Sequence, residues 1–241
     1  MGDLDLDDPQ TTEQRLALIR RKPFLEAIYR EWYDAIAHDV RGERVVELGS
    51  GAGFLREHLP RAITSEVFFV RHVDLVFDAR ALPLRSESID ALVLVDVLHH
   101  VPDARAFFGE AVRALRRGGR VVMIEPWVTP WSRLIYSNFH HEPFRPAATT
   151  WEFASTGPLS GANGALPWIL FDRDRAQFEK EFPALRIESI APLMPLRYLL
   201  SGGLSMPSLV PSWTFKFFRA IDRALARPMA MFAKIVVEKS S

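Results

Sequence analysis

The stretch that decides the fold is Arg44-Val45-Val46-Glu47-Leu48-Gly49-Ser50-Gly51-Ala52-Gly53-Phe54. A short, largely β-branched run ends in an acidic residue and is followed by glycines at three alternate positions. This pattern is typical of a buried parallel strand that turns tightly into the N-terminus of a helix. Glycine lets the backbone take positive φ and lets a ligand approach it closely, and the helix offers unpaired N–H groups. The stretch therefore predicts a site for a nucleotide-like ligand.

The spacing of the glycines narrows the class of ligand. The dinucleotide fingerprint G-x-G-x-x-G would need a third glycine where the sequence has Phe54. The observed pattern, E-x-G-x-G-x-G, resembles the first motif of class I methyltransferases, which use S-adenosylmethionine (SAM). The resemblance implies SAM as cofactor, S-adenosylhomocysteine as product and a place for Glu47 near the methionine end. The other cofactor contacts that it implies in the turn come from Gly49, Ser50, Gly51 and Gly53.

Two further carboxylates follow at expected strand ends. A second strand over 62–67 places Glu66 where its two oxygens can accept hydrogen bonds from ribose hydroxyls, although a strand-end charge that merely faces water fits the same pattern. The next strand, 72–77, follows too soon for the usual crossover helix. It leads into Asp78-Ala79-Arg80-Ala81-Leu82-Pro83, which resembles the family's D-A-x-x-L-P segment. The resemblance implies that Asp78 holds the adenine amino group and that the Ala79 N–H meets the ring.

The apolar run 88–101 predicts a fourth strand covered on both faces. Asp96 and His100 leave it at the carboxyl end of the sheet, where ligands of open α/β sheets bind. The segment Asp96-Val97-Leu98-His99-His100 resembles the family's exit from strand four and lacks the proline-proline-aromatic signature of nucleic-acid amino methyltransferases. His100 is the first candidate for a general base, with His141 and Glu125 as second choices, and a purely structural histidine stays an alternative.

The pairs at 99–100 and 140–141 also raise the question of a metal. Adjacent histidines on a helix or strand diverge, and no matching carboxylate spacing accompanies them. We therefore predict no metal site.

The remaining pattern predicts one α/β domain over 1–241. It comprises an N-terminal helical cap (1–42), a SAM-binding core (43–136) and substrate-side loops with the last two strands (137–241). Helices are expected over 11–40, broken at Pro23, over 54–59, from Asp103 to the glycines at 118–119, and over 131–139 and 172–182; strands are expected over 120–126, 185–190 and 229–238. The family resemblance implies a Rossmann-like seven-stranded sheet in the order 3-2-1-4-5-7-6, with the last strand antiparallel. The helical cap could bring Lys22, Tyr29 and Tyr33 to the cofactor or the substrate.

The stretch 191–224, between the last two expected strands, is far longer than a hairpin needs. It is rich in large apolar residues and is broken by glycines and prolines, so it cannot be one membrane helix. It could be a packed helical insert, a lid over the pocket, a homodimer face, or a patch at a membrane interface with Arg197, Lys216 and Arg219 at its rim. The last alternatives leave room for a hydrophobic, lipid-linked acceptor.

Composition narrows the remaining functional classes. Thirty basic and thirty acidic residues cancel, so no global field would collect nucleic acid, and the absence of cysteine excludes thiol chemistry. We see no secretory signal and no span of eighteen apolar residues, and expect a cytoplasmic protein, peripheral to the membrane at most. A SAM-dependent methyltransferase acting on a small or hydrophobic acceptor fits best. The alternatives are a catalytically inactive SAM-fold subunit that binds a partner and, less favoured by the glycine spacing, an NAD(P)-dependent oxidoreductase.

Overall fold

The computed structural model describes residues 9–51, 54–71, 73–139, 142–157 and 160–240 of the 241-residue chain. The helices and strands in these ranges are α1 (Pro9–Arg20), α2 (Pro23–Asp39), β1 (Val45–Leu48), α3 (Leu55–His58), β2 (Ile63–Glu66), β3 (Leu75–Val76), β4 (Ile89–Val95), η1 (Leu98–His100), α4 (Ala104–Ala114), β5 (Leu115–Pro126), α5 (Pro130–Phe139), α6 (Leu166–Trp168), η2 (Ile169–Arg173), α7 (Arg175–Glu181), β6 (Leu185–Leu193), α8 (Arg197–Leu200), η3 (Ser212–Thr214), α9 (Phe215–Met229) and β7 (Phe232–Lys239).

The described strands form one sheet in the order β3-β2-β1-β4-β5-β7-β6. Neighbouring strands from β3 to β5 pair in parallel, whereas β7 runs antiparallel to both β5 and β6. The predicted Rossmann-like sheet, with its strand order and its antiparallel last strand, is therefore confirmed.

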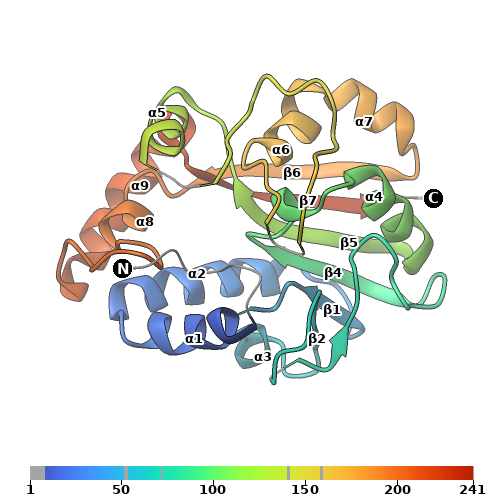
Figure 1. Ribbon diagram of the computed structural model, residues 1–241, viewed down its shortest axis with the longest axis horizontal. Helices are drawn as coiled ribbons and strands as arrows, with labels where there is room; N and C mark the ends of the chain where they lie inside the picture. The colour runs from blue at the N-terminus through green and yellow to red at the C-terminus, as the bar shows by residue number, and fades with distance from the viewer. Residues whose placement is uncertain (1–8, 52–53, 72, 140–141, 158–159, 241) are drawn as a thin grey trace.

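Alternate residues of the central strands pack into two hydrophobic cores, one on each face of the sheet. On one face, Val46 and Leu92 pack with Phe108 of α4 and with residues of α6, η2 and α7. On the other, Val45 and Val93 pack with residues of α1, α2, α5 and α9. In Figure 1, α4, α6 and α7 lie at the upper right of the sheet, and α1 and α2 lie at its lower left. Because both faces are covered, the free edge for a ligand lies at the carboxyl ends of the strands.

Several predicted boundaries are wrong for identifiable reasons. The third strand, expected over 72–77, is reduced to Leu75–Val76, because Asp74 folds back and its carboxylate accepts a hydrogen bond from the Thr64 backbone N–H at 2.9 Å. Helix α4 ends at Ala114 rather than at the glycines 118–119, since Leu115 already has extended backbone angles and begins β5. The helical stretch expected from position 172 begins at Leu166, and β7 begins at Phe232 rather than at 229.

The predicted insert folds into α8, η3 and α9, and it is tied to the N-terminal helices. Arg197, expected at an exposed rim, is instead buried: its guanidinium donates to Asp222 of α9 at 2.7 Å and to Glu31 of α2 at 2.9 and 3.0 Å. The Lys22 ammonium donates to the carbonyls of Gly203 and Met206 at 2.7 and 2.6 Å. These contacts hold the insert against the cap.

Within the described ranges, none of the helices has the length and the apolar character that crossing a bilayer requires.

Candidate functional site

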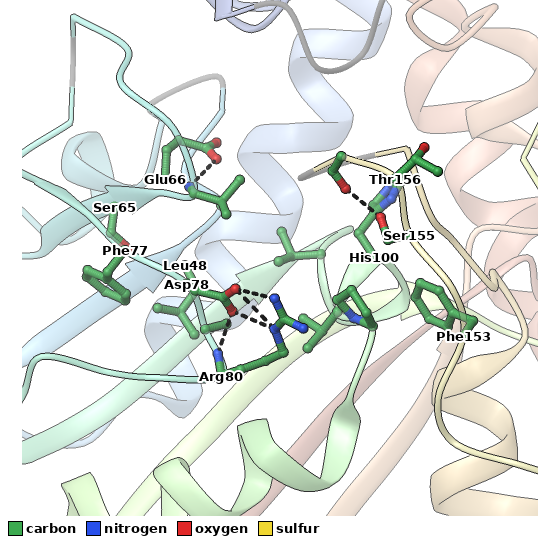
Figure 2. A pocket seen from close by; sticks show the side chains of 17 residues that line it. Leu48, Ser65, Glu66, Phe77, Asp78, Arg80, His100, Phe153, Ser155 and Thr156 are labelled. Atoms are coloured by element: carbon green, nitrogen blue, oxygen red, sulfur yellow. Dashed lines mark hydrogen bonds and ion pairs between the residues drawn. The ribbon is translucent and has the colours of Figure 1, made fainter.

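A cavity of about 470 Å³ opens at the carboxyl ends of β1, β2 and β4. Figure 2 shows Glu66 and Phe77 on one side, Asp78 and Arg80 along the bottom, and His100 with Phe153, Ser155 and Thr156 opposite. The volume lies in the range of about 300–1,000 Å³ that is common for small-molecule sites. Of the predicted cofactor residues, those that line the cavity are Gly49, Glu66, Asp78 and Ala79.

The turn after β1 depends on glycine at two positions. Gly49 has φ +62°, and a Cβ there would lie 2.5 Å from Cγ2 of Val97. Gly51 has φ +39°, and its N–H donates to Oε1 of Glu66 at 2.7 Å. Both positions therefore disfavour L side chains, for strain alone at Gly51 and for strain plus a clash at Gly49. Gly53 lies outside the described residues.

Ser50 supports this turn from behind. It is buried, its N–H donates to the Ser65 carbonyl at 2.9 Å, and its Oγ accepts from the Ser65 N–H at 3.0 Å. Ser50 does not line the cavity, and neither does Gly51. Ser50 thus holds the turn after β1 against β2.

The two acidic residues at the ends of β1 and β2 have different surroundings. Glu66 faces the cavity, and its oxygens accept from the N–H groups of Gly51 and of Val67, the latter at 3.3 Å. Burial raises its pKa, whereas these hydrogen bonds lower it. Glu47 is fully buried behind the turn and has no hydrogen-bond partner among the described residues; burial raises its pKa to about 8. The nearby hydroxyls of Ser50 and Tyr33 lower the pKa of Glu47, but by less than burial raises it. Glu47 therefore holds its proton at neutral pH.

Asp78 lies in the cavity and is already paired. The Arg80 guanidinium donates to both of its oxygens at 2.6–3.0 Å, and the Arg80 N–H donates to Oδ1 at 2.8 Å. These bonds lower the pKa of Asp78, so it is a carboxylate at neutral pH. An oxygen can accept more than one hydrogen bond, so Asp78 can still meet an amino group, with Arg80 beside it.

Asp96 follows β4 with φ +62°, which is unusual for a residue other than glycine and is a feature of functional sites. Burial raises its pKa to about 6. Arg15 of α1 is close enough to lower the pKa values of both Asp96 and Glu66 by its charge. Asp96 does not line the cavity. Three residues of the N-terminal helical cap were named from the sequence. Tyr29 lies near Asp96, and Tyr33 lies near Glu47. Lys22 instead donates to the carbonyl of Gly203 in the insert.

The two histidines at the end of β4 do not diverge. They lie in the short 3-10 turn η1, with ring centroids 4.2 Å apart, and the expectation of divergence is wrong. Nδ1 of His99 lies 2.8 Å from Oε2 of Glu125, and Nδ1 of His100 lies 3.2 Å from the Gly161 carbonyl. Both Nε2 atoms approach Glu142, at 3.4 Å from His99 and 3.6 Å from His100. Carboxylate groups thus do accompany the pair.

The histidines differ in charge. Burial alone would lower the pKa of His99, but the carboxylates of Glu125 and Glu142 raise it well above its usual value. Burial and the neighbouring charge on His99 lower the pKa of His100 to about 4, so His100 is neutral at physiological pH. Glu125, a second-choice base, is fully buried, and its Oε1 accepts from the N–H groups of Val97 and Leu98. It holds the turn rather than facing the cavity. His141 lies outside the described residues.

The sequence did not indicate Arg15, His99 or Glu142 as site residues. His99 and Glu142 could have been flagged as members of the H-H and H-H-E motifs. Their approach depends on a contact between segments about forty residues apart, which spacing alone does not reveal.

A family model described as "Methyltransferase domain" matches residues 46–123, which span β1 to β5 and include the glycine turn and Asp78. The resemblance to class I SAM-dependent methyltransferases is confirmed. The comparison with curated proteins gave no match.

Solved structures of methyltransferases share the fold over nearly the whole chain. A SAM-dependent methyltransferase of Thermotoga maritima, described as a possible histamine N-methyltransferase, superposes with a TM-score of 0.54 at 19% identity and covers 92% of this chain and 99% of its own. Geranyl diphosphate C-methyltransferase from Streptomyces coelicolor A3(2) gives 0.53 at 17% identity, with coverage of 98% and 85%. At these identities the likeness extends to the fold and not to the acceptor.

Proposed function

We propose that this protein transfers a methyl group from SAM to a small or hydrophobic acceptor. The observation that carries the proposal is the cavity itself, in which a glycine turn with positive φ and two carboxylates from neighbouring strand ends face one space. Such a space suits a nucleoside, with a diol to meet one carboxylate and an amino group to meet the other.

The residues on the cavity wall fit parts of the cofactor. Each oxygen of Glu66 accepts one backbone hydrogen bond and keeps a lone pair for a ribose hydroxyl. Asp78 and the Ala79 backbone would receive the adenine. Arg15, near Glu66 and Asp96, supplies positive charge that would offset a bound carboxylate. Glu47, Ser50 and Gly51 would act by holding the turn, and we keep Asp96 as a contact at the methionine end.

Methyl transfer depends mainly on the alignment of the acceptor with the methyl group of SAM. Bound SAM supplies an electrophilic methyl group on a sulfonium, and the protein has to hold the acceptor in line with it and exclude water. His100 lines the cavity, and because its Nδ1 faces a carbonyl, which can only accept, Nε2 is the unprotonated atom. We assign His100 the role of general base, with Nε2 accepting a hydrogen bond or a proton from the methyl acceptor.

Calorimetric titration with SAM, S-adenosylhomocysteine and NAD tests the cofactor assignment. We expect saturable one-to-one binding of the first two and none of NAD; NAD binding alone would favour the oxidoreductase. Turnover distinguishes the enzyme from an inactive subunit, with transfer of a labelled methyl group to lipid and small-molecule extracts as the readout. SAM binding without label transfer to any extract would favour the subunit. His100→Ala is expected to lower transfer with little change in SAM affinity.

We also propose that the insert rests on an anionic membrane surface, where a hydrophobic acceptor would be found. Large apolar side chains are exposed there: Trp213 is 82% exposed, Phe217 64%, Leu209 63% and Met206 56%. A patch of this kind on a folded domain indicates an interaction surface, and Trp is favoured where water meets lipid.

The charge of the insert favours lipid over a second copy of the chain. The insert, residues 191–224, contains four basic residues and a single acidic one, Asp222, which is buried with Arg197, whereas the whole chain is neutral. Lys216, Arg223 and Arg227 are exposed on α9. Two such faces would repel each other, but an anionic headgroup layer complements them.

Flotation with vesicles tests this surface. We expect the protein to float with phosphatidylserine-containing vesicles and much less with phosphatidylcholine alone, and the Trp213→Ser/Phe217→Ser variant to stay in solution. Phe69→Ser is the matched control, because Phe69 is 71% exposed but lies outside the insert. Equal flotation of the variant and the wild type would refute the membrane surface. A dimer in solution that the double variant abolishes would assign the face to a second copy instead.

A further inference from the structure

The group formed by His99, His100 and Glu142 goes beyond what methyl transfer by positioning requires. It stands at the inner wall of the cavity, where His100 is a lining residue. Side-chain exposure is 1% for His99, 14% for His100 and 19% for Glu142. Three potential ligand atoms, one from each residue, lie within 4.8 Å of one another.

The distances fit a shared ion better than direct hydrogen bonds. Oε2 of Glu142 lies 3.4 Å from Nε2 of His99, and Oε1 of Glu142 lies 3.6 Å from Nε2 of His100. An N–H···O hydrogen bond would bring such atoms to about 2.7–3.2 Å. In a tetrahedral zinc site with bonds of about 2.0–2.1 Å, neighbouring ligand atoms are about 3.3 Å apart. Each of these two oxygen–nitrogen distances is close to the distance between two ligands of one small cation.

The partners behind the two rings have the arrangement that metal-binding histidines need. Such a histidine donates its other ring N–H to a carboxylate or a backbone carbonyl, which turns the free nitrogen toward the metal. His99 has Glu125 in that position at 2.8 Å, and His100 has the Gly161 carbonyl at 3.2 Å. Glu125 is itself held by the N–H groups of Val97 and Leu98 at 2.8 and 2.7 Å. Both Nε2 atoms consequently face Glu142.

The local charge also calls for a cation. Asp96, Glu125 and Glu142 surround the two imidazoles, and Nδ1 of His99 lies 3.9 Å from Oδ1 of Asp96. Arg15 is the guanidinium whose charge reaches Asp96 and His100. The protonated His99 and Arg15 offset part of this negative charge, and a divalent ion would take the place of the proton on Nε2 of His99. A second group, Asp96–His99–Glu125, is geometrically close as well, but Nδ1 of His99 cannot both donate to Glu125 and bind a metal.

We propose that Nε2 of His99, Nε2 of His100 and a carboxylate oxygen of Glu142 bind a divalent transition-metal ion such as Zn²⁺. Two imidazoles and a carboxylate form a donor set that leaves coordination positions open. If the proposed methyl transfer is right, an acceptor with a hydroxyl, thiol or amine would occupy an open position, where the ion would ease loss of its proton. His100 would then act on the acceptor through the ion.

Metal binding to the chelator-treated, full-length protein tests the site without any need for turnover. We expect one equivalent of Zn²⁺ to bind in a calorimetric titration, and Co²⁺ to give the visible absorption of a four- or five-coordinate site. His100→Ala and Glu142→Gln should each weaken Zn²⁺ binding at least 100-fold. Glu125→Gln, which alters only the group behind His99, should weaken it about 10–100-fold.

Two surface variants are the matched controls. His38, with 85% of its side chain exposed, and Glu152, with 57% exposed, lie outside the cluster, so His38→Gln and Glu152→Gln should bind Zn²⁺ as the wild type does. Thermal unfolding and SAM titration of each variant report whether it has folded. Absence of saturable Zn²⁺ binding in the wild type would overturn the proposal, and so would unchanged binding in both His100→Ala and Glu142→Gln. Either result would leave SAM binding intact and the proposed function standing, whereas loss of SAM binding alone would reject that function and not the metal site.

Discussion

The first half of the sheet and the segments that follow it contribute in different ways. Residues 46–123 match a methyltransferase family model and hold the glycine turn, Glu66 and Asp78. Residues 137–229 supply Glu142, the Gly161 carbonyl, the wall at 153–157 and the exposed insert. Cofactor binding belongs to the part of the chain that a family motif describes. The features that would select an acceptor lie in the part that no motif describes.

The largest expected effect is a loss of SAM affinity caused by a side-chain clash in the first region, which a control variant with backbone strain alone should not show. Gly49→Val should reduce SAM affinity at least 1,000-fold in calorimetric titration, because a side chain there meets Val97 and displaces the turn. Gly118→Val is the control: Gly118 has φ +74°, but a Cβ at this position would meet nothing within 4 Å, so the variant loses stability without losing affinity. Equal SAM affinity for Gly49→Val and the wild type would place the cofactor elsewhere.

A second prediction concerns stability against pH. Burial raises the pKa of Glu47 to about 8 in the folded state, above its value when unfolded, so its contribution to stability is complete below about pH 4.5 and is lost as the pH rises through 8. At pH 7 this loss is roughly 3 kcal/mol, from 1.36 kcal/mol per pH unit. Urea unfolding from pH 5 to 8 should show a falling free energy for the wild type and a flatter one for Glu47→Gln. Parallel curves would mean that Glu47 is ionised when folded.

A third, smaller effect tests the ribose carboxylate. Glu66→Gln keeps the shape of the side chain but replaces one acceptor oxygen with a donor, so SAM affinity should fall about 10–100-fold, as for one or two charge-assisted hydrogen bonds. The Gly51 N–H must also find its partner again, which can shift the turn. Glu57→Gln, an exposed change on α3, should leave the affinity as it was. Full affinity in Glu66→Gln would remove Glu66 from the cofactor site.

The smallest prediction compares a helix cap in the first region with a cap between the two regions. Asp103 accepts from the Ala106 N–H at 3.0 Å at the start of α4, and Thr129 Oγ1 accepts from the Ser132 N–H at 3.1 Å at the start of α5. Asp103→Ala should cost about 1 kcal/mol of unfolding free energy. Thr129→Ala should cost somewhat more, because the buried Thr129 hydroxyl also donates to the Ala230 carbonyl at 2.9 Å. Denaturant unfolding checks both, and the reverse ranking would contradict this reading of the caps.

Features that depend on local sequence patterns could be predicted from the sequence, and features that depend on contacts between distant segments could not. The turn at Gly49 and Gly51 was predictable because apolar runs and glycine spacing are local patterns, whereas the strand order came from the family resemblance. The length of β3 was not, since it depends on a single contact between Asp74 and Thr64. The cluster around His99 and His100 was missed because a 3-10 turn, rather than a helix or strand, sets the two rings side by side. The domain division at residues 42 and 136 stays a prediction.

The structure of the protein with S-adenosylhomocysteine bound would test the central claim most directly. The account predicts the nucleoside in the cavity between Gly49 and Asp78, with both ribose hydroxyls on Glu66 and the adenine at Asp78 and Ala79. Nucleoside density at any other position, with this cavity still empty, would contradict it.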